Sequence, residues 1–166
     1  YLPAYEDEKI IGFFSKFKHI DWQIFSKHTN KSYKEKNCYI RPVNAKAFTE
    51  SFINCEGIVC GAGFETPAEA LYLGKKLLVI PMKHQYEQHC NAAAAAELGV
   101  PVIKSLKKKH ISKAENWLME NKTITLDFEN ETESIIDSIL SSFKTSMPVT
   151  EKPALPLLPE QYLALR

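Results

Sequence analysis

Short apolar runs alternate with segments of helical spacing along most of the chain. The apolar runs are rich in aliphatic and aromatic residues and are bounded by polar or turn-forming residues, which predicts strands. They lie at Trp22–Ser26, 39–43, 57–60, 76–81 and 100–103. We also expect residues 1–5 to be the exit of a strand, and the chain to be a piece of a longer protein.

Between these runs, apolar residues recur at helical spacing. Helices are predicted after the acidic Glu6–Glu8, after Asn44 as N-cap, around Ala68–Leu71 and through Ala92–Ala96, with Gly74 and Gly99 ending the last two. Two more are predicted near Ser112–Glu120 and 131–143. Residues 147–166 contain four prolines and are expected to form a tail.

Strands and helices in alternation predict an α/β fold, with a Rossmann-like parallel sheet covered by helices on both faces. We expect one such domain over residues 1–146. Ligands of these folds bind at the carboxyl ends of the strands. The loops after Cys60 and Pro81 are therefore the places to look for a site.

Composition excludes several function classes. The 166 residues carry a net charge of +1 and 45% hydrophobic residues, so no overall charge favours nucleic acid. No apolar run approaches the roughly 20 residues of a membrane span. The four cysteines lack the spacing of metal or disulfide sites, so we expect no metal, no cofactor and a cytoplasmic protein.

The first loop reads Cys-Gly-Ala-Gly-Phe-Glu-Thr-Pro over residues 60–67. Gly61 and Gly63 would allow unusual backbone torsions and a close approach to a ligand, and Thr66 is a natural N-cap. The free N–H groups of the following helix form an anion site. Glu69, one turn later, could accept hydrogen bonds from a ribose diol. A purely structural glycine-rich turn remains the alternative.

The second loop follows the most hydrophobic strand and is dense in polar groups. Its Glu87 and Gln88 are suited to grip sugar hydroxyls, because a carboxylate accepts and an amide both donates and accepts. A solvated helix start is the alternative interpretation of this pair.

Taken together, the segment from about residue 37 to 102 resembles the donor-binding, C-terminal domain of GT-B glycosyltransferases, among them the MurG-type enzymes and the UDP-glucuronosyltransferases, and residues 57–100 carry the resemblance. The shared order is strand, glycine-rich turn, Thr-x-x-Glu, helix, strand ending in Pro, acidic-Gln pair and Ala-rich helix, over the segment GIVCGAGFETPAEALYLGKKLLVIPMKHQYEQHCNAAAAAELGV.

The resemblance implies a role for each matching position. With Gly61, the diphosphate would be held by Ala62, Gly63, Phe64 and Thr66. Glu69 would bind the ribose, Glu87 and Gln88 the transferred sugar, and Val43 and Asn44 would lie near the base.

Two positions depart from the family pattern. Cys60-Gly61 stands where many relatives place a phosphate-binding histidine, and the common Gly-x-Pro after the helix is Gly74-Lys75-Lys76. Phosphate affinity would then depend on backbone donors, or on Lys83 or His84.

The resulting expectation is the donor-binding half of a hexosyltransferase that uses a nucleoside-diphosphate sugar, most often a UDP-sugar, with inversion and without a required metal. The acceptor and the general base would belong to a missing N-terminal domain, as would any membrane association, so no catalytic residue is expected in this inactive half. The alternatives are a UDP-sugar epimerase of GT-B architecture and a non-catalytic nucleotide-binding module.

Overall fold

The computed structural model of the chain describes residues 1–120, 123–124 and 129–146. The chain divides into two compact units, Tyr1–Leu126 and Asp127–Arg166. Among the described residues, the first unit contains the strands and every helix except one, and the candidate site lies within it. The second unit contains the described helix α6 (Thr132–Ser146).

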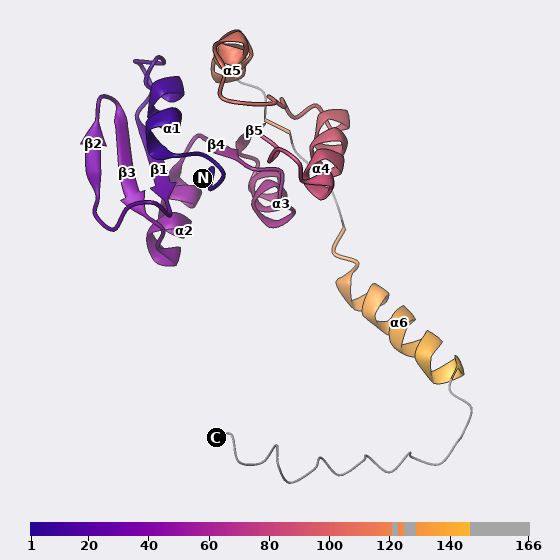
Figure 1. Ribbon diagram of the computed structural model, residues 1–166. Helices are drawn as coiled ribbons and strands as arrows, with labels where there is room; N and C mark the ends of the chain where they lie inside the picture. The colour runs from indigo at the N-terminus through magenta and orange to yellow at the C-terminus, as the bar shows by residue number, and fades with distance from the viewer. Residues whose placement is uncertain (121–122, 125–128, 147–166) are drawn as a thin grey trace, which may run out of the picture. The chain divides into compact units, whose positions relative to one another are not determined.

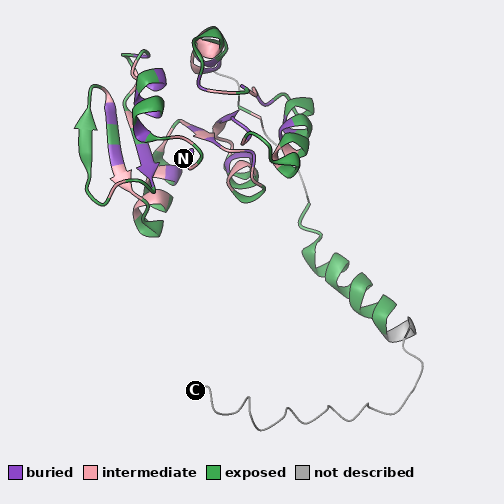
Figure 2. Cartoon of the chain, in the orientation of Figure 1, coloured by how far each residue is buried: buried purple, intermediate pink, exposed green. Residues whose placement is uncertain are grey.

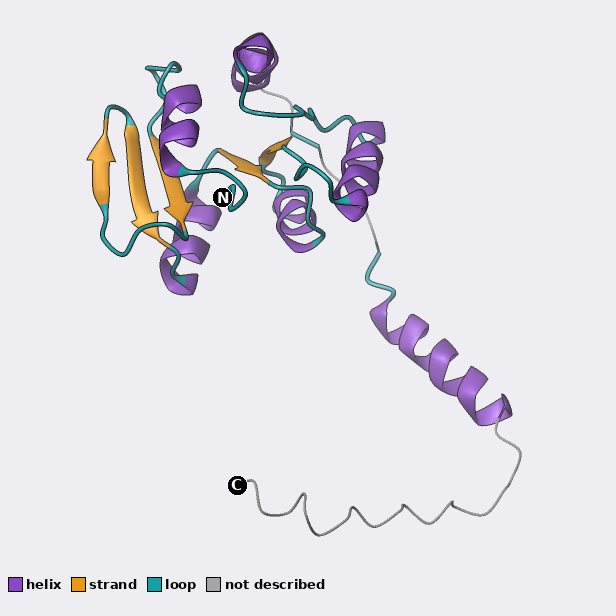
Figure 3. Cartoon of the chain, viewed as in Figure 1, coloured by secondary structure: helices purple, strands orange, loops and turns teal. Residues whose placement is uncertain are grey.

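The elements of the first unit follow the alternation that the sequence predicts (Figures 1 and 3). In chain order they are α1 (Asp7–Phe14), β1 (Trp22–Ser26), β2 (Tyr33–Glu35), β3 (Cys38–Pro42), α2 (Ala45–Asn54), β4 (Gly57–Cys60), α3 (Glu65–Tyr72), β5 (Lys76–Val79), α4 (Tyr86–Glu97), the short 3-10 helix η1 (Lys108–His110) and α5 (Ile111–Met119).

The strands form two groups, and each group contains one parallel pair of strands. In the first group β1 pairs with β3 in parallel, and the short β2 adds to the other edge of β3 in the antiparallel sense. In the second group β4 pairs with β5 in parallel, and a single parallel bridge joins Val79 to Val102. In Figure 1 the N-terminus of the chain lies between the two groups.

Strand β5 shows why the two faces need helices. Leu78 belongs to one hydrophobic cluster, together with residues of α1, β1, β3 and α5, whereas Leu77 and Val79 belong to a second cluster with residues of α2, α3 and α4. Successive side chains of a strand point to opposite faces, so this strand is buried on both (Figure 2). The fold is therefore α/β and Rossmann-like, as predicted.

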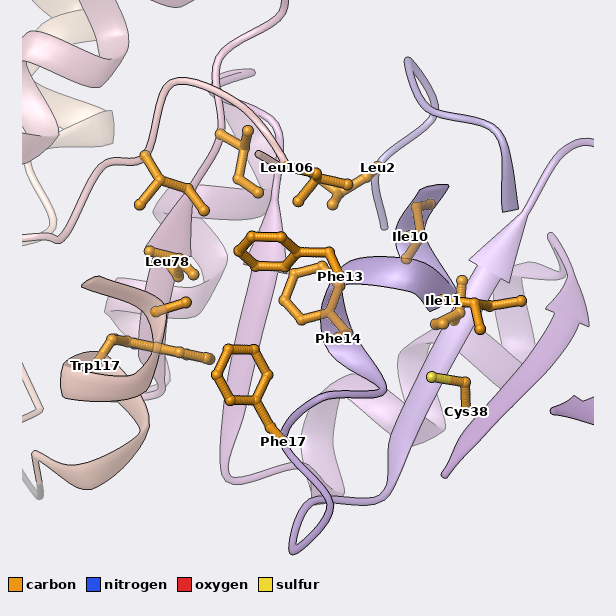
Figure 4. Close-up of a cluster of buried hydrophobic side chains, with 14 of the residues drawn as sticks. Leu2, Ile10, Ile11, Phe13, Phe14, Phe17, Cys38, Leu78, Leu106 and Trp117 are labelled. Carbon is orange, nitrogen blue, oxygen red and sulfur yellow. The ribbon is translucent and has the colours of Figure 1, made fainter. Parts of the chain in front are cut away.

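Aromatic side chains of α1 and the turn after it dominate the first cluster. Phe13, Phe14 and Phe17 are each at most 3% exposed, and in Figure 4 they lie between Leu78 and Trp117 on one side and Cys38 on the other. The core therefore connects α1 with both groups of strands.

Most predicted elements are confirmed, and the differences are local. The strand expected at 39–43 begins and ends one residue earlier, and β2, whose three residues are all exposed, was not predicted because it has no apolar pattern. Residues 100–103 make only a bridge at Val102, and the strand at 76–81 ends at Val79. Residues 1–5 form a turn, with the Tyr5 N–H donating to the Leu2 carbonyl.

Helix α6 is described by itself. It carries exposed Ile135, Ile136, Ile139 and Leu140. Residues 147–166, predicted to be a proline-rich tail, lie outside the described residues. Among the helices described, none has the length and apolar character needed to cross a bilayer.

Candidate functional site: a pocket at the carboxyl ends of β4 and β5

The loops after β4 and β5 meet the N-terminal turn at a pocket of about 150 Å³. The turn between β4 and α3 contributes Gly61, Gly63 and Thr66, and the loop before α4 contributes Met82. The remaining lining residues are residues 1–5, Cys60, Ile80 and Gln88. The pocket therefore lies at the carboxyl ends of two parallel strands, where ligands of such sheets bind.

Gln88 holds the two loops together. Its side-chain oxygen accepts the backbone N–H of Ala62 at 3.1 Å and that of Met82 at 2.9 Å. Both partners are donors, so the atom between them must be the oxygen of the amide. The Gln88 amide nitrogen is left to donate elsewhere, because the oxygen alone makes both bonds.

Ala62 is held from its other side as well. It is only 1% exposed, and its carbonyl accepts a hydrogen bond of 3.0 Å from the Asn91 side chain. Its N–H and carbonyl thus both have partners from α4. Ala62 therefore shapes the turn, and its N–H already has an acceptor in Gln88.

Helix α3 begins earlier than predicted. Its first residue is Glu65, and Phe64 stands at the N-cap position without making a side-chain hydrogen bond to the helix. Thr66 is therefore inside the first turn and is not the N-cap. Pro67 has no N–H, so the donors at this end are the first backbone N–H groups, at Glu65 and Thr66. An N-terminus without a side-chain cap leaves these groups available to an anion.

The glycines of the turn matter because they lack a side chain, and their backbone torsions are ordinary. Gly61 and Gly63 do not have positive φ, in contrast to Gly74 at 61° and Gly99 at 89°, which end their helices. An added Cβ on Gly63 would meet no described atom within 4 Å. The described chain has room for a side chain at this position. A ligand that lies against the backbone would need that room, and only glycine leaves it open.

The floor of the pocket is uncharged. Cys60 is 1% exposed, and burial raises the pKa of its thiol to about 11. At neutral pH the thiol keeps its proton, so no negative sulfur opposes an anion in the pocket. The start of α3 then contributes a positive field at this place.

The other predicted site residues lie outside the pocket lining. Phe64 is 76% exposed, and Glu69 on α3 and Glu87 on α4 are exposed too. Val43 and Asn44 follow β3, where the Asn44 side chain caps α2 by accepting the Ala47 N–H at 3.0 Å. Lys83 and His84 are exposed residues of the loop after β5, and His84 has a positive φ of 64°.

Two contributions to the site were not predicted. Asn91 lies one turn after Gln88 on α4, so the two amides are on one face of the helix. This spacing could have indicated that both bind the backbone of the neighbouring loop. The N-terminal residues Leu2, Pro3 and Ala4 line the pocket, although their sequence has no distinctive motif.

We compared the chain with known proteins. The curated proteins contain no match to it. The model of the family described as Glycosyl transferase family 1 matches residues 1–120, which include every element that builds the pocket. The chain therefore belongs to Glycosyl transferase family 1, a family of glycosyltransferases.

Proposed function

We propose that this chain is the donor-binding domain of a glycosyltransferase that takes a hexose from a nucleoside-diphosphate sugar, with a UDP-sugar as the donor. The observation that carries the proposal is the Gln88 side chain, which joins the turn before α3 to the loop before α4. The uncapped start of α3 and the start of α4 therefore border the same pocket.

The diphosphate belongs at the start of α3. The N–H groups of Glu65 and Thr66 would donate to it, and the open space at Gly63 allows it to approach the backbone. Leaving-group charge develops on the diphosphate during transfer, and preorganised N–H donors stabilise such charge without a metal.

The sugar belongs at the start of α4. Glu87 is in the first turn of this helix, next to Gln88. The Gln88 nitrogen would donate to a sugar hydroxyl, while the exposed Glu87 carboxylate would accept from another. These contacts would orient the anomeric carbon for attack.

The pocket is small for a whole nucleotide sugar. Its volume of about 150 Å³ is about half of the lower end of typical ligand pockets, about 300 Å³. This supports a site shared with a second domain, which would hold the acceptor and supply the general base. Under this proposal the transferase is inverting, and the chain by itself is inactive.

Glu87→Ala tests the proposal against a simple nucleotide binder. In the full-length enzyme we expect UDP-sugar affinity and turnover to fall, while UDP affinity stays nearly unchanged. Glu97→Ala, at the far end of the same helix, is the matched control. Equal losses for UDP and UDP-sugar would contradict a sugar contact. Release of the free UDP-hexose epimer by the full-length enzyme would instead identify the epimerase, and sugar binding without turnover the non-catalytic module.

A further inference from the structure

Positive charge is concentrated in the loop before α5 and in the first turn of this helix. Residues 98–114 contain five of the 21 basic side chains of the chain and no acidic side chain. In the rest of the chain, acidic side chains outnumber basic ones. All five basic residues are exposed lysines, and we call them the lysine patch: Lys104, Lys107, Lys108, Lys109 and Lys113.

The core holds the backbone that carries the lysine patch. Just before the patch, the Ile103 N–H donates to the Val79 carbonyl at 3.0 Å. Within it, Leu106 is only 7% exposed and belongs to the first hydrophobic cluster. In η1 the His110 N–H donates to the Lys107 carbonyl at 2.9 Å. The lysine side chains therefore extend into solvent from a backbone that is fixed at several points.

The described chain does not neutralise this charge. Within the described residues, none of the five lysines makes a salt bridge or a side-chain hydrogen bond. Lys109 and Lys113 are four residues apart across the junction of η1 and α5, a helical spacing at which like charges repel. The first turn of α5 contains no acidic residue, so the positive end of this helix adds to the same field. An anion outside the chain would relieve the repulsion.

The lysines act on a common place, the side chain of His110. Burial lowers the pKa of His110, and the positive charges of four lysines of the patch, with Lys109 foremost, lower this pKa further. These four lysines therefore surround one point, and an anion at the patch would meet their combined field.

The lysine patch lies at the same edge of the fold as the candidate pocket. Val102 forms a parallel bridge with Val79, so the loop after it leaves from the carboxyl ends of the strands, as the loops after β4 and β5 do. Leu106 of this loop shares a hydrophobic cluster with Leu2, which lines the pocket, and Figure 4 shows both side chains in that cluster.

We propose that the lysine patch binds an anionic phospholipid surface. The patch contains lysine and no arginine, whereas protein interfaces are enriched in arginine and depleted of lysine. A bilayer attracts either residue through its charge alone. A single-stranded nucleic acid fits less well, because residues 98–116 offer no Phe, Tyr or Trp on which bases could stack.

This proposal gives the present chain a membrane contact of its own, without the help of another domain. The bilayer would face the edge of the fold at which the candidate pocket lies. Because no nucleotide takes part in the contact, the proposal is independent of the proposed donor site.

Cosedimentation of the 166-residue chain with lipid vesicles tests the proposal. We expect binding to phosphatidylcholine vesicles that contain about 30% phosphatidylserine, and none to vesicles of phosphatidylcholine alone. Salt at about 1 M should release the chain, because it screens charges beyond about 3 Å. Absence of binding to the phosphatidylserine vesicles would overturn the proposal.

Paired substitutions assign the binding to the patch. Each lysine near an anionic surface contributes about fivefold to binding, so Lys108→Gln with Lys109→Gln should weaken it about 25-fold. The same two positions changed to arginine should bind like the parent, because the charge is kept. Thermal unfolding of the glutamine variant should show no loss of stability, since it relieves repulsion between like charges.

The matched control is Lys16→Gln with Lys18→Gln, at two exposed lysines in the turn after α1. It removes the same charge outside the patch and should bind about as well as the parent. Equal losses in the two glutamine variants would overturn the proposal, because net charge alone would then explain binding. Tighter binding to polyglutamate or to a DNA oligonucleotide than to the vesicles, at the same ionic strength, would overturn it in favour of an acidic protein or a nucleic acid.

Discussion

The side-chain oxygen of Gln88 accepts the backbone N–H of Ala62 at 3.1 Å, across the gap between the start of α4 and the turn after β4. The same oxygen accepts the Met82 N–H at 2.9 Å. One amide thus fixes the relative positions of two loops that precede two different helices. In the proposed site these loops hold the diphosphate and the sugar, so their separation decides whether one ligand reaches both.

Gln88→Ala should lower the free energy of unfolding by about 1–3 kcal/mol, because two partly buried N–H groups lose their acceptor. Gln88→Glu keeps an acceptor oxygen and should be much closer to the parent. Urea unfolding of the three proteins measures the difference. A Glu variant as unstable as the Ala variant would show that the two hydrogen bonds do not hold the loops.

The Glu variant also separates the two roles of Gln88. It keeps the acceptor but loses the amide nitrogen that we assign to a sugar hydroxyl. We expect UDP affinity to fall, because the added negative charge opposes the diphosphate, and UDP-sugar affinity to fall further, as measured by calorimetry on the full-length enzyme. Equal losses for UDP and the UDP-sugar would restrict Gln88 to its structural role.

Glu69→Ala should weaken UDP binding by about 1.5–3 kcal/mol if this carboxylate accepts the ribose hydroxyls. Glu69 is exposed on α3, so thermal unfolding should change little. Glu97→Ala, at the far end of α4, is a control for the general loss of an acidic side chain. UDP affinity equal to that of the parent would exclude the ribose contact.

Asn44→Ala should destabilise the chain by about 0.5–2 kcal/mol, because the Ala47 N–H loses the cap of α2. Asn44→Asp retains the acceptor and should restore most of the stability. If Asn44 also contacts the base, both variants should bind UDP more weakly. A loss of stability with no change in UDP affinity would leave Asn44 as a cap only.

The thiol of Cys60 predicts a dependence of stability on alkaline pH. Its pKa is raised by burial to about 11, above the 9.0 of an ordinary thiol, so the folded chain holds this proton more tightly than the unfolded chain. The contribution is complete below pH 9 and is lost as the pH rises towards 11. Urea midpoints between pH 8 and 11 should fall less steeply for Cys60→Ala than for the parent. Cys90→Ala, at an exposed cysteine, is the control and should behave like the parent.

The sequence predicted the fold well where a strong local pattern agrees with packing. Strands β1 and β4 have the predicted bounds, and Asn44 is the predicted cap. Prediction failed where the determinant is a contact between distant residues. The start of α3 depends on the turn that Gln88 and Asn91 fix from α4, and a preference of Thr66 for the N-cap position could not reveal that contact.

The candidate site was also predictable only where a local sequence pattern determines it. Gly61, Gly63, Thr66 and Gln88 were predicted and line one pocket, because loops after neighbouring parallel strands meet at one edge. The hydrogen bond between Gln88 and Ala62 joins residues that are 26 positions apart, and residues 2–4 line the pocket beside residues that are far away along the chain. No local pattern in the sequence encodes these neighbours.

Calorimetric titration of the 166-residue chain with UDP and with UDP-glucose tests the central claim most directly. We expect both to bind weakly, since the proposed site is shared with a second domain, and we expect Gly63→Val to abolish binding by filling the space beside the start of α3. Gly12→Ala, in α1 and away from the pocket, should bind like the parent. Weak binding that Gly63→Val abolishes is the predicted result. Absence of binding by any nucleoside diphosphate at millimolar concentration, or equal binding by Gly63→Val, would contradict a donor site at this pocket.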